Sequence, residues 1–162
     1  MHPVGLLKVL VLIVLANATP VIAAQIFGAR FSHPLDAHAT FADGRPLFGR
    51  SKTVRGVLLA LIVTAAAAPL LGLDPALGLL AAATAMAGDL ASSFLKRRLG
   101  LAASDRATGL DQIPESLFPL VACSPMLGLN VLDVAAGTVI FLIGEILISR
   151  VLYRLRLRDR PY

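Results

Sequence analysis

The stretch PALGLLAAATAMAGDLASSFLKRR, residues Pro75–Arg98, joins an apolar run to a charged end. Asp89 lies inside the end of the run, and a cationic triplet, Lys96, Arg97 and Arg98, follows it. A charge in hydrocarbon costs several kcal/mol unless it is paired, solvated or used. Residues at i, i+3, i+4 and i+7 share a helix face, which predicts one polar stripe made of Asp89, Ser92, Ser93 and Lys96. Such a stripe can hold a divalent cation at its carboxylate and a phosphate at its lysine.

The composition indicates a membrane protein. Apolar residues make up 57% of the chain and charged residues 15%, and the mean hydropathy is +0.79, whereas soluble domains carry about 25% charged residues. A length of 162 residues fits a single domain, 1–162. The one cysteine, Cys123, lies in an apolar run, which favours a small buried side chain and excludes a disulfide framework.

Five apolar segments are near the roughly 20 residues that cross a bilayer as a helix. This predicts an all-α polytopic protein with spans over Val4–Ile26, Gly56–Leu73, Pro75–Leu95, Ile113–Leu132 and Val134–Leu152. The very short connections after the second and fourth segments predict two tight helical hairpins. Asn130 and Asp133 are expected to cap the second of these turns.

The distribution of positive charge predicts the orientation. Of the 15 Lys and Arg residues, all but Lys8 fall between residues 30 and 55, between 96 and 106, or from 150 onward. By the positive-inside rule these three segments are cytoplasmic, as is the carboxy terminus, and the amino terminus is outside. The same rule explains the pI of about 10.1 without nucleic acid, since no aromatic residues alternate with the cations as a nucleic-acid surface requires.

The first segment has one alternative interpretation. Its apolar run and the small residues near Ala23 imitate a cleavable signal peptide. Cleavage would leave four spans and place five cations on the wrong side. The polar residues Asn17 and Thr19 and the helix-perturbing Pro20 fit better with a retained helix that faces a cavity.

The loop SHPLDAHATFADGRPLFGRSKTVRG, residues 32–56, is a second candidate centre. Its glycines and closely spaced donors suit a polyphosphate, with candidates Gly49, Ser51, Lys52, Thr53 and Arg55. It is not a Walker A loop, because Arg50 and Ser51 separate Gly49 from Lys52. An ordinary basic loop that touches anionic lipid is the alternative. His33 and His38 are expected to be loop residues and not metal ligands.

Carboxylates near the fourth and fifth segments form a third centre. Asp111 is placed to cap a helix, and Glu115 suits the first helical turn. A second carboxylate at the membrane face of Asp89 is also what a bridged-metal site requires, so both interpretations of Asp111 stay open. Glu145 is expected to have a structural partner within the bundle.

These centres, taken in order, resemble the CDP-archaeol synthase family, a small relative of the CDP-diacylglycerol synthases. The resemblance covers nearly the whole chain. It is carried by ANATPV (16–21), PLD (34–36), DGRPLFGRSKTVRG (43–56), GDLASSFLKRRLG (88–100), LDQ (110–112) and RDRPY (158–162). The chain departs from the family pattern at Val54, where an aromatic residue is usual, and at Arg50, where an acidic residue is common.

The resemblance implies a magnesium-dependent cytidylyltransferase in the cell membrane with its active site on the cytoplasmic side. CTP and a lipid phosphate would give a CDP-lipid and pyrophosphate. Asp89 and Asp111 would bind Mg²⁺; Lys52, Arg55 and Lys96 would bind the CTP phosphates; Arg97 or Arg98 would bind the lipid phosphate. Further candidates, from cavity lining to contacts with metal-bound water, are Asn17, Asp43 and Ser92.

Two alternatives remain from the residues alone. A CTP-dependent polyprenol kinase would release CDP and no pyrophosphate. A non-catalytic transport subunit or scaffold would use the intramembrane polar residues without any need for Asp89, Lys96 and Lys52 to meet at one face.

Overall fold

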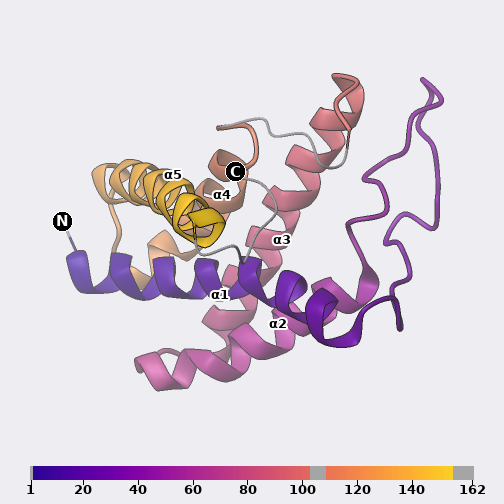
Figure 1. Ribbon diagram of the computed structural model, residues 1–162. Coiled ribbons are helices and arrows are strands. Elements are labelled where there is room, and N and C mark those ends of the chain that lie inside the picture. The colour runs from indigo at the N-terminus through magenta and orange to yellow at the C-terminus, as the bar shows by residue number, and fades with distance from the viewer. Residues whose placement is uncertain (1, 103–108, 155–162) are drawn as a thin grey trace.

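The computed structural model describes residues 2–102 and 109–154, with side chains as far as Arg150, and is all-helical over that part of the chain (Figure 1). The elements are α1 (Pro3–Phe27), α2 (Val54–Ala67), the 3₁₀ turn η1 (Ala68–Leu71), α3 (Pro75–Arg98), α4 (Gln112–Leu127) and α5 (Val131–Arg154). The long segment between α1 and α2 contains only isolated β-bridges, such as Pro34 with Thr53. The motif at residues 158–162 lies outside the described residues.

The helix ends follow from local sequence signals. Asp74 caps α3 by accepting a hydrogen bond from the backbone N–H of Ala76 at 2.7 Å, and Pro75 occupies the first helical turn. At the start of α5, the Asn130 side chain accepts from the backbone N–H of Asp133 at 3.0 Å, and the Asp133 carboxylate accepts from the N–H of Asn130 at 3.1 Å. This reciprocal arrangement confirms both residues as caps.

Helix α1 packs against all four other helices, with two clusters of buried side chains. The first joins Leu12 and Ile13 of α1 to Leu120 and Cys123 of α4. The second consists mainly of alanines, from Ala16 to Ala85, and lets α1, α2 and α3 approach closely. Cys123 is therefore a buried apolar side chain, in agreement with the expectation.

Helices α3 and α4 are in backbone contact at Gly88. A Cβ atom added there would overlap the carbonyl group of Pro114 and lie 2.8 Å from the backbone nitrogen of Glu115. Only glycine allows this contact between backbones. It places Asp89, the next residue, beside the first turn of α4.

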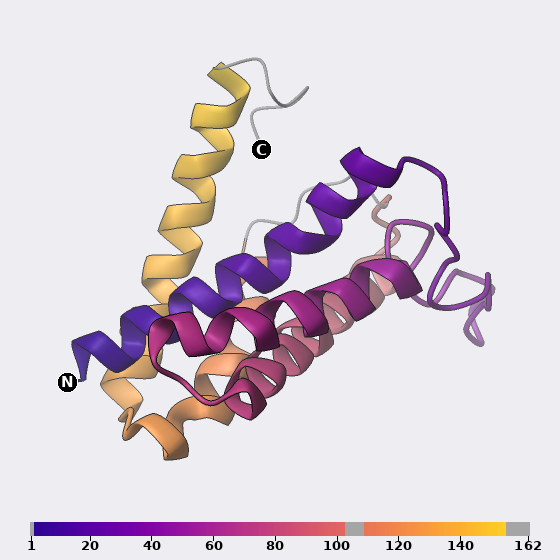
Figure 2. The same cartoon turned by 90° about the horizontal axis from the view of Figure 1, so that it is seen from below.

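The connections separate into two groups at opposite ends of the bundle (Figure 2). The α2–α3 and α4–α5 connections lie at the same end as the start of α1. The segment 28–53 and the carboxy-terminal end of α3 lie at the other end (Figure 2). The segments that carry the cations of residues 30–55 and 96–98 thus lie at the same end of the bundle (Figure 2).

Four helices of the described region are long and apolar enough to span a membrane: α1, α2 extended by η1, α3 and α5. The expected fourth span, 113–132, is shorter than predicted, because α4 ends at Leu127, where Gly128 adopts a left-handed conformation (φ 65°). Its 16 residues are about 24 Å long, less than the roughly 30 Å of a bilayer core. Helix α5 correspondingly begins at Val131, before the expected Val134.

Candidate active site

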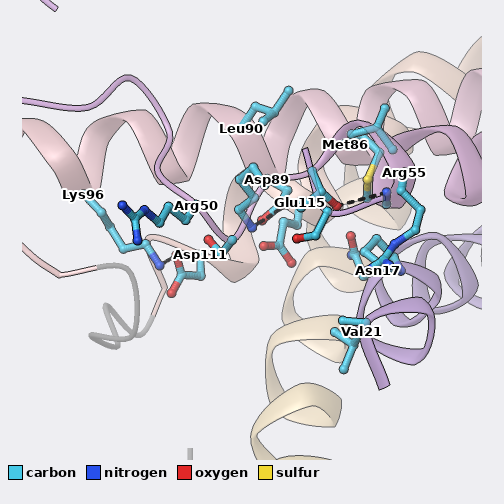
Figure 3. A pocket seen from close by; sticks show the side chains of 18 of the residues that line it. Asn17, Val21, Arg50, Arg55, Met86, Asp89, Leu90, Lys96, Asp111 and Glu115 are labelled. Atoms are coloured by element: carbon cyan, nitrogen blue, oxygen red, sulfur yellow. Dashed lines mark hydrogen bonds and ion pairs between the residues drawn. The ribbon is translucent and has the colours of Figure 1, made fainter. Parts of the chain in front are cut away.

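A cavity of about 530 Å³ lies among all five helices and is the centre of the site (Figure 3). Each helix contributes a polar side chain to its wall: Asn17 from α1, Arg55 from α2, Asp89 and Lys96 from α3, Asp111 and Glu115 near the start of α4, and Glu145 from α5. The loop before α2 adds residues 50–53. Residues far apart in the sequence therefore form one polar surface inside an apolar bundle.

Two lysine–aspartate ion pairs dominate the charge distribution of the cavity. The Lys52 Nζ atom lies 2.5 Å and 2.6 Å from the two carboxylate oxygens of Asp89. The Lys96 Nζ atom lies 2.7 Å from Asp111 Oδ1. Side-chain exposures between 11% and 23% leave these pairs only partly solvated, so their attraction is stronger than that of a surface pair.

The pairing differs in detail from the predicted polar stripe. Asp89 and Lys96 both line the cavity, but they do not pair with each other. Each forms its ion pair with a residue from a different segment of the chain. Ser92 is buried, and its hydroxyl group donates to the backbone carbonyl groups of Gly88 and Asp89. Its hydrogen bonds are therefore made within α3. Asp111 occupies the cap position of α4 but makes no capping hydrogen bond; its carboxylate binds Lys96 instead.

Glu115 and Glu145 belong to the site, although the sequence suggested structural roles for both. The Glu115 side chain lies next to Asp89 within the cavity (Figure 3) and within hydrogen-bonding reach of it. The spacing of Glu115 four residues after Asp111 was an available signal, because it places both on one face of α4. Glu145 had no such signal, since only the packing of α5 brings it to the cavity wall.

Asp36 organises the loop that carries Lys52. Its carboxylate is buried and accepts hydrogen bonds from the backbone N–H groups of His38 (3.1 Å), Phe48 (3.0 Å) and Gly49 (2.9 Å). Burial acts to raise the pKa of Asp36, but these three donors hold the pKa below its usual value of 3.8. In the sequence, Asp36 stands out only as part of the motif PLD (34–36), with no signal for this role.

A reciprocal arginine contact attaches the same loop to the end of α3. Arg98 pairs with Asp43 at 2.5 Å, donates to the carbonyl oxygens of Arg45 and Pro46, and lies about 5 Å from the ring centres of Phe41 and Phe94. Arg45 in turn donates to the last carbonyl groups of α3, those of Arg97 and Arg98. These contacts close the carboxy-terminal end of α3.

Several predicted site residues therefore lie outside the cavity wall. Asp43 and Arg98 hold the loop, Arg97 donates to the carbonyl oxygen of Leu101, and the N–H of Gly49 is used by Asp36. Ser51, Thr53 and Arg55 do line the cavity. Thr53 also caps α2, and Arg55 donates to the carbonyl oxygens of Gly28 and Arg30, which fixes the end of α1 beside the cavity.

The donor set suits a hard divalent cation. Asp89 and Glu115 supply neighbouring carboxyl groups, and Asp111 supplies another on the same wall. Within residues 2–102 and 109–150, no group of three or more Asp, Glu, His or Cys side chains is arranged as a complete metal site. Mg²⁺ does not need one, because it is usually held by one or two carboxylates together with water and substrate phosphates.

The fold and the cavity define a class: a helical membrane protein with a polar site of carboxylates and cations. A family model described as CarS-like CDP-archaeol synthase matches residues 74–162. The CDP-archaeol synthase of Sulfurisphaera tokodaii is 36% identical over 137 residues, covering 80% of this chain and 81% of that protein. That of Pyrobaculum calidifontis is 33% identical over 156 residues, covering 91% and 90%.

Similarity in three dimensions agrees with these sequence matches. A solved structure of an intramembrane enzyme for archaeal membrane lipid biosynthesis superposes with a TM-score of 0.71 at 30% identity, covering 88% of this chain and 90% of that one. The chain belongs to the CDP-archaeol synthase family, which confirms the resemblance carried by its motifs.

Proposed function

We propose that this protein is a membrane cytidylyltransferase that converts CTP and a lipid phosphate into a CDP-lipid and pyrophosphate. The observation that carries the proposal is the cavity in which two lysine–aspartate pairs from three separate segments share one wall within an apolar bundle. A nucleoside triphosphate needs cations for its phosphates, and a phosphoryl transfer between two anions needs its charge neutralised. Membership of the CDP-archaeol synthase family supports the same reaction.

The reaction needs no protein nucleophile. An oxygen of the lipid phosphate, already anionic near neutral pH, attacks the α-phosphorus of CTP. The bond between that phosphorus and the bridging oxygen to the β-phosphate breaks, and pyrophosphate leaves with the bonding electrons. The protein contributes position and charge.

The two ion pairs place opposite charges together in the site. Lys52 and Lys96 neutralise Asp89 and Asp111, whose charges would otherwise be costly inside the bundle. In the proposed reaction, Asp89 and Asp111 would hold Mg²⁺ and the lysines, with Arg55, would bind the CTP phosphates. The metal ion would supply charge neutralisation to the phosphates. Glu115, beside Asp89, joins the metal-binding candidates.

The contacts of Arg97 and Arg98 do not favour a role for either residue in binding the lipid phosphate. Both lie outside the cavity wall and donate to backbone carbonyl groups. The assignment of Arg97 or Arg98 to the lipid phosphate stays a prediction. Ser51 and Thr53, in contrast, are on the wall beside Lys52, where they can donate to CTP.

We also propose that the chain crosses the membrane five times, with the amino terminus outside and the cavity open to the cytoplasm. Four helices have the length and composition of spans. Helix α4 is the fifth; it is short and ends at Leu127, but it packs against α1, α3 and α5. Backbone groups beyond the end of a short helix are tolerated at membrane depth where neighbouring protein surrounds them.

The test is a product analysis of purified protein with CTP, magnesium and a panel of lipid phosphates and lipid alcohols. Pyrophosphate and CDP-lipid should form in equal amounts from a lipid phosphate, and only with a divalent cation. Release of CDP from a lipid alcohol would establish the kinase alternative, and no turnover with any compound would favour the scaffold. Turnover that survives EDTA would remove the metal from the proposal.

A further inference from the structure

A second cavity lies beside the first, between α1 and α5. Its volume is about 290 Å³, and its apolar lining comes from Leu10, Val14 and Ala18 on α1 and from Ile140, Phe141 and Ile148 on α5. Val14, Ile140 and Ile148 are about half exposed at the surface of the bundle. Because α1 and α5 both have the properties of membrane spans, this groove faces hydrocarbon.

The groove and the polar cavity are continuous. Asn17 and Glu145 line both of them. Asn17 is a member of the predicted cavity-lining set, and its amide nitrogen Nδ2 is buried with no hydrogen-bond partner among the described residues. An unpaired donor inside a membrane protein is costly, and it lies where an apolar space meets a polar one.

An amphiphile with an anionic head fits this pair of cavities. We propose that the α1–α5 groove binds a hydrocarbon chain of the lipid phosphate and that the Asn17 side chain donates to its phosphate at the junction. This inference rests on the proposed function and adds the place and direction from which the lipid enters. Lys52 and Arg55, the candidates for the CTP phosphates, lie on the wall of the polar cavity, so the lipid phosphate would enter beside the nucleotide site.

Position 144 offers a way to fill the groove without disturbing the protein. Gly144 lies in the groove lining, and a Cβ atom added there would meet no other atom within 4 Å. Gly144→Leu therefore extends into open groove space. Ala135→Leu is the matched control, because Ala135 is exposed on the same helix, and a spacing of nine residues places it on the opposite face.

The experiment compares two glycerol phosphates, one with two long hydrocarbon chains and one with two short chains. Gly144→Leu should raise KM for the long-chain compound by about tenfold, the effect of excluding roughly two methylene groups. KM for CTP and for the short-chain compound should stay unchanged, and Ala135→Leu should match the parent protein in all three. Asn17→Asp, which replaces the donor by an acceptor, should raise KM for both lipid phosphates.

A binding measurement tests the groove independently of catalysis. A long-chain glycerol phosphate with a diazirine at the end of one chain should label α1 and α5 on irradiation, and Gly144→Leu should reduce that labelling while Ala135→Leu should not. If the parent protein forms no CDP-lipid, the proposed function fails, whatever is labelled. If CDP-lipid forms but Gly144→Leu behaves like Ala135→Leu, or labelling falls on other helices, the groove assignment is overturned.

Discussion

Asp89 is the residue on which the proposed chemistry depends most. Asp89→Asn keeps the shape of the side chain but gives a hard cation a much poorer ligand. Activity should fall by orders of magnitude, and extra magnesium should restore little. Because Lys52 loses its partner at a partly solvated position, unfolding free energy should fall by only about 1 kcal/mol.

A double variant tests whether the loss of stability in Asp89→Asn comes from the unpaired lysine. Asp89→Asn with Lys52→Gln removes both charges, so thermal stability should return toward that of the parent while activity stays low. Activity and thermal unfolding are measured together for the single and double variants. A folded Asp89→Asn protein that keeps most of its activity would contradict the assignment of Asp89 as a Mg²⁺ ligand.

Individual site residues could be predicted where they lie within the sequence motifs or next to them. Asp89, Lys96, Lys52, Asp111 and Asn17 were predicted from the sequence as site residues, and the structure brings them to one cavity. Which lysine pairs with which aspartate could not be predicted, because helix periodicity describes only one helix at a time. The contacts of Arg98 depend on a fold of the 28–53 loop that has no periodic pattern.

Among the longer segments, the 28–53 loop depends on a single carboxylate. Asp36→Asn places an amide N–H₂ group against at least one of the three backbone donors, which should cost about 1–3 kcal/mol of local stability. Since the pKa of Asp36 in the folded loop lies below 3.8, its contribution is complete above that value and is lost as the pH falls through the folded pKa.

Limited proteolysis of the loop measures this effect. Asp36→Asn should be cleaved faster than the parent at neutral pH, and the difference should shrink once the pH is below the folded pKa of Asp36. Asp74→Asn is the control, because asparagine caps a helix as well as aspartate does and Asp74 belongs to the α2–α3 connection, at the other end of the bundle from the loop. Equal cleavage of both variants at neutral pH would contradict the role given to Asp36.

The helices themselves were predictable to different degrees. The first and third segments match α1 and α3 closely, because both are long apolar runs with a proline in the first helical turn. The fourth did not match, because hydropathy continues through Gly128 and Asn130, where the backbone turns. Apolar composition shows that a segment is buried or in lipid, but the end of a helix depends on backbone conformation.

For the entire chain, the orientation in the membrane is the central prediction. Single cysteines at Ser51 and at Asp74, in a Cys123→Ala background, should react from opposite sides: Ser51 from the cytoplasm and Asp74 from outside. Both positions are exposed. The segment 28–53, which contains Ser51, and the α2–α3 connection, which contains Asp74, lie at opposite ends of the bundle (Figure 2). Reaction from the same side would contradict the five-span arrangement and would favour four spans with a cleaved first segment.

The contact at Gly88 has a consequence for motion. With backbone against backbone, α3 can neither slide along α4 nor rotate about its own axis without driving a side chain into Pro114. We therefore expect the two helices to move together, so that the spacing of Asp89 and Glu115 changes little when either helix fluctuates. Whatever adjustment a bound substrate requires falls to side-chain rotamers and to the parts of the protein that this contact does not join.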